Sequence, residues 1–181
     1  MTQPRKTIVI LCEDLQQEVF VRSFLQKRGF NRRWFSPNIC PSGQQSGEQF
    51  VRDRYPAEVR AYRSKKNHLD IALVVVIDAD TNEVENRFKQ LEQALKDQSL
   101  PPRQPDEKIA VFVPKRNIET WIHYLMGESV DELTAYSKFS RQEGNCKPYV
   151  EELAVQCQQV GLTDDAPLSM RIACAELQKI L

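Results

Sequence analysis

The sequence predicts an α/β fold: a mostly parallel sheet with helices on both faces, plus a helical C-terminal extension. Three observations lead to this class. Apolar runs of strand length alternate along the chain with segments of helical periodicity. Residues 73–77 are apolar throughout, which is typical of a strand buried on both faces of a parallel sheet. After Gly127 no strand-like run remains, so we expect the end of the chain to be helical.

The first strand and helix are predicted close to the N-terminus. Residues 7–12 form an uninterrupted apolar run after Thr7, which indicates a buried strand. In residues 15–28 the large apolar side chains fall on one stripe at helical spacing, and the polar ones fall outside it. Gly29 is a typical residue for the end of such a helix.

The next segment predicts a strand, a loop and a second helix. Residues 30–36 indicate the strand, and residues 37–47, which are polar and contain two glycines, indicate the loop. A helix is expected over about residues 48–65. Pro56 lies inside it, so we expect a kink or a division into two pieces there.

Two further strand–helix pairs follow. Residues 70–77 predict a strand and residues 82–97 a helix. The proline-rich stretch at 98–107 is expected to be a loop. Residues 108–113 then predict a strand, which Pro114 ends, and a helix is expected over about residues 117–127.

The organisation of the chain is predicted to change near residue 127. We expect an α/β domain over residues 1–127 and a helical extension over 128–181 that packs on the same domain. The clearest helices of the extension are expected at 147–159 and from residue 168 to the end.

Composition and charge limit the functions that the chain can have. At 181 residues the chain is long enough for one well-buried domain. The formal net charge is zero, so no overall basic field attracts nucleic acid, although a local patch can. Five scattered cysteines form no CxxC pair, so we expect neither a disulfide framework nor a zinc site. With no signal-peptide pattern and no apolar run near about 18 residues, a reduced cytoplasmic setting and no membrane partner are expected.

Carboxylates follow two of the expected strands directly. Glu13 and Asp14 come after the first strand, and Asp78 and Asp80 come after the strand that begins near residue 70. The carboxyl ends of neighbouring parallel strands meet at one edge of a sheet, so these acids are expected to converge. Like charges in close proximity repel unless a cation lies between them. The sequence therefore predicts a metal site at Glu13, Asp78 and Asp80, for Mg²⁺ or Mn²⁺.

A third junction between a strand and a helix carries Lys115, Arg116 and Glu119. Glu119 is expected in the first turn of its helix, where the helix dipole favours a carboxylate. Its presence is therefore explained either by helix stabilisation or by a role in an active site.

Cations and aromatic residues are interleaved between residues 31 and 66. This composition suits contact with a phosphate backbone. A solvated helix face explains the same pattern, because Glu48, Asp53 and Glu58 are mixed in. The cations expected to contact nucleic acid are Arg32, Arg33, Arg52, Arg54, Arg63 and Lys65.

An acid directly after the first strand, with Asp-x-Asp after a later strand, resembles the Toprim fold of topoisomerases, bacterial primases and OLD-type nucleases. The match lies in Cys-Glu-Asp at residues 12–14 and Ile-Asp-Ala-Asp at 77–80. A further element is the apolar strand that ends in proline before an acid and a tryptophan, at 113–121. The resemblance is closest to small OLD-nuclease-like Toprim proteins of bacterial defence loci and spans about residues 7–127.

The resemblance implies Mg²⁺-dependent phosphodiester chemistry on nucleic acid, DNA or RNA, with hydrolysis by a nuclease in bacterial defence or DNA processing as the expected activity. It implies that Asp78 and Asp80 bind the metal and that Glu13 acts as a general acid/base or a further ligand. Lys115 or Arg116 would neutralise charge on the phosphate. An ATPase partner is also expected in this family context. The expected catalytic residues are Glu13, Asp78, Asp80, Lys115, Arg116 and Glu119.

Two residues depart from the family pattern and keep alternatives open. Asp14 stands where a glycine is usual, and Gln17 stands where OLD-type proteins have a second glutamate. These departures favour a non-catalytic Toprim-shaped module that binds nucleic acid or a partner. A receiver-like signalling domain is the other alternative, with Asp78 as the phosphate acceptor and Lys115 after a later strand.

Overall fold

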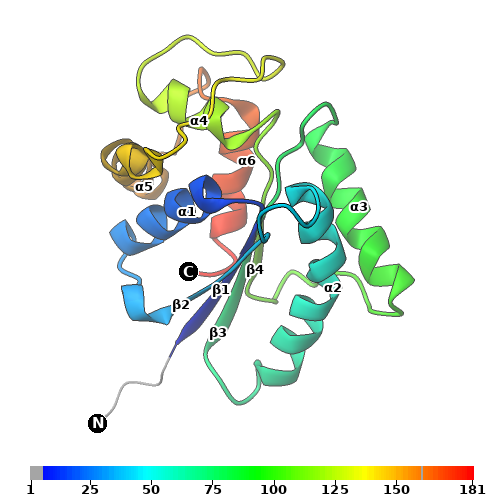
Figure 1. Cartoon of the computed structure of the whole chain (residues 1–181). Coiled ribbons are helices and arrows are strands. Elements are labelled where there is room, and N and C mark those ends of the chain that lie inside the picture. Colours follow the sequence, from blue (N-terminus) through cyan, green and yellow to red (C-terminus); the bar gives the residue numbers. More distant parts are fainter. Residues whose placement is uncertain (1–5, 160) are drawn as a thin grey trace.

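The computed structural model describes residues 6–159 and 161–181, and within them it contains a four-stranded, all-parallel sheet (Figure 1). The strand order is β2-β1-β3-β4. The predicted α/β class with a parallel sheet is therefore confirmed. The strands are β1 (Thr7–Cys12), β2 (Phe35–Ile39), β3 (Ile71–Val76) and β4 (Ile109–Phe112).

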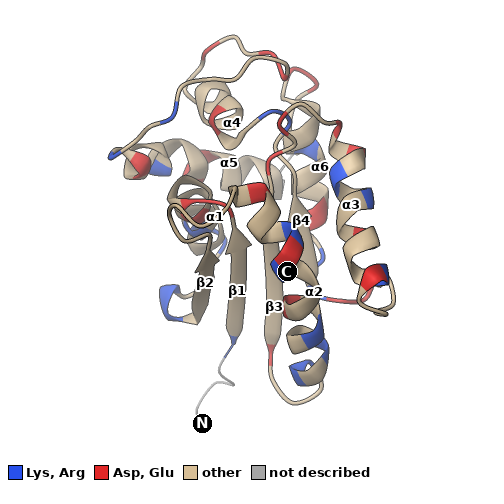
Figure 2. Cartoon of the chain, turned by 45° about the vertical axis from the view of Figure 1, so that its right-hand side comes forward, with Lys and Arg blue, Asp and Glu red and all other residues tan. Residues whose placement is uncertain are grey.

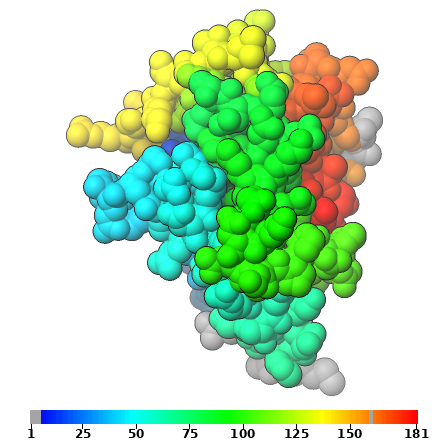
Figure 3. All heavy atoms as spheres, turned by 90° about the vertical axis from the view of Figure 1, so that its right-hand side faces the viewer, coloured from blue at the N-terminus to red at the C-terminus, as the bar shows by residue number. Residues whose placement is uncertain are grey.

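Helices cover both faces of the sheet (Figure 1). One face carries α2 and α3, and α3 lies in the green middle of the surface seen in Figure 3. The other face carries α1, α5 and α6. The helices are α1 (Leu15–Lys27), α2 (Gly47–Lys65), α3 (Val84–Asp97), α4 (Ile118–Leu125), α5 (Lys147–Gln159) and α6 (Leu168–Leu177), with short 3₁₀ turns η1 (Arg32–Trp34) and η2 (Glu143–Cys146).

Alternation along the buried strands divides the core in two. All six residues of β3 are buried. Val74 and Val76 pack with α1, α5 and α6, whereas Leu73 and Val75 pack with α2 and α3. The period of two in a strand produces this division, because successive side chains point to opposite faces. The uninterrupted apolar run in the sequence thus corresponds to burial on both sides.

Two elements differ from their predicted form. The second strand is β2 at 35–39 rather than 30–36, because Asn31 caps η1 and turns the chain before the strand begins. The side-chain oxygen of Asn31 accepts a hydrogen bond from the backbone N–H of Arg33 at 2.9 Å. The helix expected to kink or divide at Pro56 is not divided: α2 runs through Pro56 as one helix, and Pro56 is buried.

The C-terminal helices belong to the same core as the sheet. α5 packs on α1, and α6 packs on β4. Val150, Leu153 and Leu177 are buried in the cluster that includes β1 and β3. The division into a 1–127 domain and an extension stays a prediction. No helix in the described part of the chain combines the length and apolar character needed to cross a bilayer.

The free edge of β4 is closed by side chains from outside the sheet. Glu176 of α6 accepts a hydrogen bond from the backbone N–H of Val111 at 2.9 Å. Arg103 donates to the backbone oxygen of Ile109 at 3.0 Å and forms an ion pair with Glu176. Unpaired strand edges are templates for pairing with another chain. This Arg103–Glu176 pair therefore both holds α6 on the sheet and blocks its edge.

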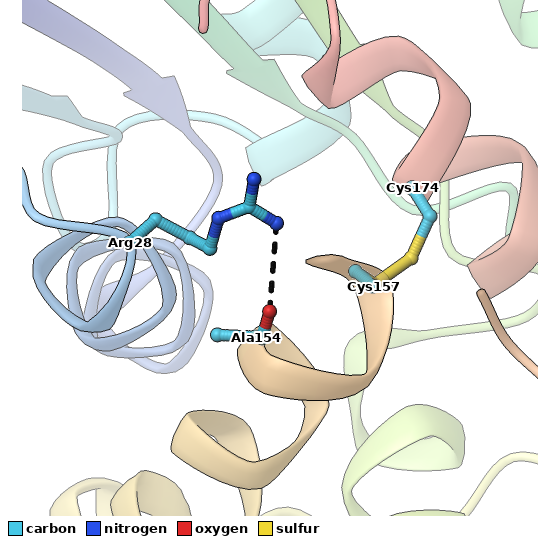
Figure 4. The surroundings of a disulfide bond; sticks show 4 residues. All are labelled: Arg28, Ala154, Cys157 and Cys174. Atoms are coloured by element: carbon cyan, nitrogen blue, oxygen red, sulfur yellow. Dashed lines mark hydrogen bonds between the residues drawn. A yellow bond between two sulfur atoms is a disulfide. The ribbon is translucent and has the colours of Figure 1, made fainter. Parts of the chain in front are cut away.

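The expectation of unpaired cysteines is wrong at two positions. Cys157 of α5 and Cys174 of α6 form a disulfide, with Cα atoms 6.0 Å apart (Figure 4). Their separation in sequence carries no pairing signal, because only the tertiary arrangement of the helices brings them within bonding distance. Beside the disulfide, Arg28 of α1 donates to the backbone oxygen of Ala154 at 3.5 Å (Figure 4).

Replacing Glu176 by alanine should destabilise the protein and expose the β4 edge. The buried N–H of Val111 loses its acceptor, which costs roughly 1–3 kcal/mol. We expect a lower thermal midpoint and, by light scattering, more self-association than for the exposed α5 control Glu151→Ala. Equal behaviour of the two variants would show that Glu176 does not protect this edge.

The disulfide predicts a thiol count. Purified protein kept without reductant should show three reactive thiols after denaturation, from Cys12, Cys40 and Cys146, and all five cysteines after reduction. Titration with Ellman's reagent measures both values. Five thiols before reduction would refute the disulfide. Because disulfides are uncommon in reducing compartments, the count also tests the expected cytoplasmic setting.

Candidate functional site

The carboxyl ends of β1 and β3 bring Glu13 and Asp78 together. The two strands are parallel neighbours, with Leu11 opposite Val75. One carboxylate oxygen of Glu13, Oε1, accepts a hydrogen bond from the backbone N–H of Asp78 at 2.6 Å. The sequence places these residues far apart, and the register of the parallel pair makes them adjacent, as expected.

Gly47, the first residue of α2, packs directly on Glu13. A Cβ atom at Gly47 would lie 2.6 Å from Cβ of Glu13 and 2.9 Å from its Oε2. No side chain fits in this space without displacing the carboxylate. Sequence analysis places Gly47 only in a polar loop, and its close approach to Glu13 is evident only in three dimensions.

Asp14 and Gln17, which depart from the family pattern, fix the start of α1. The Oδ1 atom of Asp14 accepts from the backbone N–H of Gln17 at 3.0 Å. In return, the side-chain oxygen of Gln17 accepts from the backbone N–H of Glu13 at 2.9 Å. This reciprocal arrangement is close to a capping box. It orients Glu13 without a glycine or a second glutamate in the turn.

Asp80 does not join Glu13 and Asp78 as expected. Its backbone has a φ of 53°, and its carboxylate pairs with Arg87 of α3 at 2.9 Å. Arg87 is 3% exposed and also donates to the backbone oxygen of Asp78 at 2.9 Å and to Glu48 at 3.1 Å. Sequence analysis missed Arg87, because it resembles any cation on an amphipathic helix.

No three His, Cys, Asp or Glu side chains within residues 6–159 and 161–181 are placed to hold one metal ion together. The expected ligand set of Glu13, Asp78 and Asp80 is therefore not assembled. The physical reason is Arg87: a buried guanidinium needs partners, and Asp80 supplies one.

Glu119 instead lies with the acids at the carboxyl end of β1. It is in the first turn of α4 and is 1% exposed, and neither of its carboxylate oxygens has a hydrogen-bond partner. Oδ1 of Asp78 is also buried without a partner. Unpartnered buried carboxylate oxygens are costly unless a proton or a cation satisfies them.

Burial and mutual repulsion raise the pKa values of these carboxyl groups. Burial, together with the charges of Asp80 and Asp14, raises the pKa of Glu13 to about 8 against the opposing hydrogen bond from the backbone N–H of Asp78. Burial, then the charges of Glu13 and Glu119, hold the pKa of Asp78 well above its usual value. The pKa of Glu119 is raised first by burial and then by Asp14. These carboxyl groups therefore favour a bound proton, or a cation in its place, over the bare negative charge.

A pocket of about 420 Å³ opens onto this cluster. Glu13, Asp14 and Glu119 line it, whereas Asp78 does not. Its walls are the segments 39–47 and 138–143. Lys138 extends over the rim, with its Nζ 3.7 Å from Asp14.

Lys115 and Arg116 do not line this pocket. The Nζ of Lys115 donates to the backbone oxygen of Asn82 at 2.9 Å and pairs with Glu83 at 2.9 Å. Arg116 has a φ of 70°, and its backbone oxygen accepts from the N–H of Asp80 at 2.9 Å. The two residues thus shape the turn after β3. A direct role for Lys115 beside Glu13 has no support in these contacts.

The cations expected to contact nucleic acid do not form one surface beside the acids. Arg32 and Arg33 precede β2, and Arg63 and Lys65 end α2 just before β3, so these four lie at the amino end of the sheet, opposite Glu13. Figure 2 shows their blue segments on η1 and along the lower part of α2.

Three cations of this set already have partners within the fold. Arg52 pairs with Glu48 at 2.7 Å, and Arg54 lies over the ring of Phe50. Arg63 pairs with the buried Glu107 at 2.7 Å. These contacts agree with the alternative of a solvated, paired helix face for much of this segment.

The Arg63–Glu107 pair predicts a stability change at acid pH. Burial alone would raise the pKa of Glu107, but hydrogen bonds from Arg63 and from the backbone N–H of Gln104 outweigh it, so the pKa is lowered from 4.5. The stabilisation is therefore present above pH 4.5 and is lost as the pH falls through the lower folded-state value.

We expect Glu107→Gln to lower the free energy of unfolding by roughly 1.5–3 kcal/mol at pH 7. Urea melts at pH 7 and pH 3 measure this difference. The gap between the variant and the wild-type protein should shrink at pH 3. A gap that stays constant would show that the charge of Glu107 contributes nothing to stability.

Comparison of the chain with protein-family models, with curated proteins and with solved structures gives no match. The function must therefore be argued from the geometry of the acid pocket.

Proposed function

We propose that this protein carries out Mg²⁺-dependent phosphodiester chemistry on nucleic acid, as a Toprim-type nuclease in bacterial defence or DNA processing. One observation carries the proposal: the buried, unpartnered carboxylate of Glu119 lines the same pocket as Glu13. Carboxyl groups that share one pocket and lack other partners favour a bound cation. The ATPase partner rests on the resemblance alone, and the cytoplasmic setting rests on the cysteine and signal patterns of the sequence; both belong to the same proposal.

The residues at the pocket fit a magnesium ion in donor type. Mg²⁺ takes one or two carboxylates and keeps several waters, so Glu13 and Glu119 suffice as its protein ligands. When bound, the ion would polarise a phosphoryl oxygen and activate a water molecule. The N–H of Asp78 holds Glu13 in place, and the close approach of Gly47 keeps the carboxylate from turning away.

A binding module without catalysis is the second candidate, and the Asp80–Arg87 pair favours it. With Asp80 bound to Arg87, the site has fewer free carboxylates than the resemblance implies. A receiver-like domain has weaker support. It needs a lysine beside the accepting aspartate, whereas Lys115 is bonded to Asn82 and Glu83.

Nuclease activity is tested with plasmid DNA and single-stranded RNA in Mg²⁺, in Mn²⁺ and in EDTA. We expect cleavage of at least one of the two substrates with either metal, and of neither in EDTA. Glu13→Gln and Glu119→Gln should each reduce cleavage roughly 100-fold or more, since preorganised charge is worth that much at such sites. Neither should lower the thermal midpoint, because each substitution relieves repulsion. Calorimetric titration with Mn²⁺ should show weakened binding in both.

Glu151→Gln is the matched control. Glu151 is an exposed acid on α5 and does not line the pocket. This variant should keep wild-type cleavage. Metal-independent cleavage, or full activity in Glu119→Gln, would refute the proposed site. Mn²⁺ binding without cleavage of either substrate would favour the binding module.

A further inference from the structure

We propose that the acid pocket admits one nucleotide of a single strand rather than base-paired DNA or RNA, with Lys138 contacting its phosphate. This inference rests on the proposed function, because a phosphate can enter a cluster of carboxylates only together with a divalent cation. It adds the substrate class and a binding residue from outside the predicted 1–127 domain.

The size of the pocket supports a single nucleotide. Its volume of about 420 Å³ is near the lower end of the roughly 300–1,000 Å³ found for pockets that enclose one small molecule. Residues of two chain segments, 39–47 and 138–143, line it together with the acids. A base pair needs more space than a single nucleotide, so the volume favours the single nucleotide.

The burial of the acids also favours a single strand over a duplex. The carboxylate oxygens of Glu119 are buried, and Glu119 as a whole is 1% exposed. In a duplex the phosphates lie on the outside of a stiff rod, so they would reach only the rim. A duplex would first have to unpair and unstack a nucleotide, whereas a single strand bends one inward without that step.

The walls of the pocket are suited to a base and a phosphate. Ile39 and Phe139 give it apolar surface, and Phe139 packs against His123 with ring centroids 5.0 Å apart. An aromatic wall is a stacking surface for any base, which makes the contact tolerant of sequence. Ser42, Gly43 and Gln45 supply polar groups to the same pocket.

Among the described residues that line the pocket, Lys138 is the only lysine or arginine. Its side chain is 69% exposed and its Nζ is 3.7 Å from Asp14, a distance typical of a loose surface ion pair. Its pKa is raised by the charges of Asp14, Glu119, Asp78 and Glu13 against the effect of burial, so the ammonium stays charged. Lys138 therefore has both the position and the freedom to move from Asp14 to a phosphate.

Fluorescence anisotropy tests the inference with labelled strands of about 12 nucleotides, within the range of single-strand site sizes. The same strand is measured alone and in a duplex, as DNA and as RNA, with Ca²⁺ or EDTA present. We expect at least about tenfold tighter binding of the single strand, because a duplex must first unpair and extrude one nucleotide. We also expect this binding to be lost in EDTA, because the phosphate needs the divalent cation.

Lys138→Gln should weaken single-strand binding about three- to tenfold and reduce the slope of log Kd against log salt by about 0.7, the value for one phosphate contact on a single strand. Lys89→Gln is the matched control. Lys89 is similarly exposed, at 66%, and pairs with Glu85 on α3, outside the pocket. It should leave Kd and slope unchanged.

Duplex binding as tight as that of the single strand would overturn the inference, as would absence of binding to both. Equal effects of the Lys138 and Lys89 variants would overturn the role of Lys138. A preference for single strands that depends on Lys138, in a protein that cleaves nothing in Mg²⁺, would sustain this inference and reject the proposed chemistry. Cleavage of duplex and single strand at equal rates would support the proposed chemistry and reject this inference.

Discussion

The hydrogen bond from the backbone N–H of Asp78 to the carboxylate of Glu13 is the contact on which the candidate site depends. It forms because β1 and β3 are parallel and in register, so the first residues beyond their carboxyl ends meet. It fixes one carboxylate oxygen, and Gly47 packs against the other side of the same group. The capping pair of Asp14 and Gln17 holds the backbone from which Glu13 projects. The remaining features of the pocket are arranged around this one oriented acid.

Charge balance separates the acids into two groups. Asp80 is neutralised by Arg87, which is buried and also binds the turn after β3 through the backbone oxygen of Asp78. Glu119 has no such partner within the described residues, and burial raises its pKa and that of Glu13. The first group therefore stabilises the fold, whereas the second consists of buried carboxyl groups whose raised pKa values favour a bound proton or cation.

The C-terminal helices contribute to the sheet as well as to the site. Glu176 of α6 closes the free edge of β4 together with Arg103, and the disulfide joins α6 to α5. α5 in turn packs on α1, the helix that begins at the acid cluster. The segment before α5 carries Lys138 to the pocket rim. An α/β unit ending at residue 127 would lack both the edge protection and this wall.

The sequence by itself determined the α/β class, the parallel sheet and nearly all element positions, because apolar period and length are local properties of the chain. It also placed Glu13 and Asp78 together, since both directly follow buried strands. It failed at the turn of Asp80 toward Arg87, at the Cys157–Cys174 pair and at the wall that carries Lys138. The sequence suggested that the cations of α2 form one basic surface. In the structure α2 begins beside Glu13 and runs toward the amino end of the sheet, so Arg63 and Lys65 lie far from the acids. Only tertiary packing decided these points, because burial and ion pairing depend on neighbours that sequence spacing does not encode.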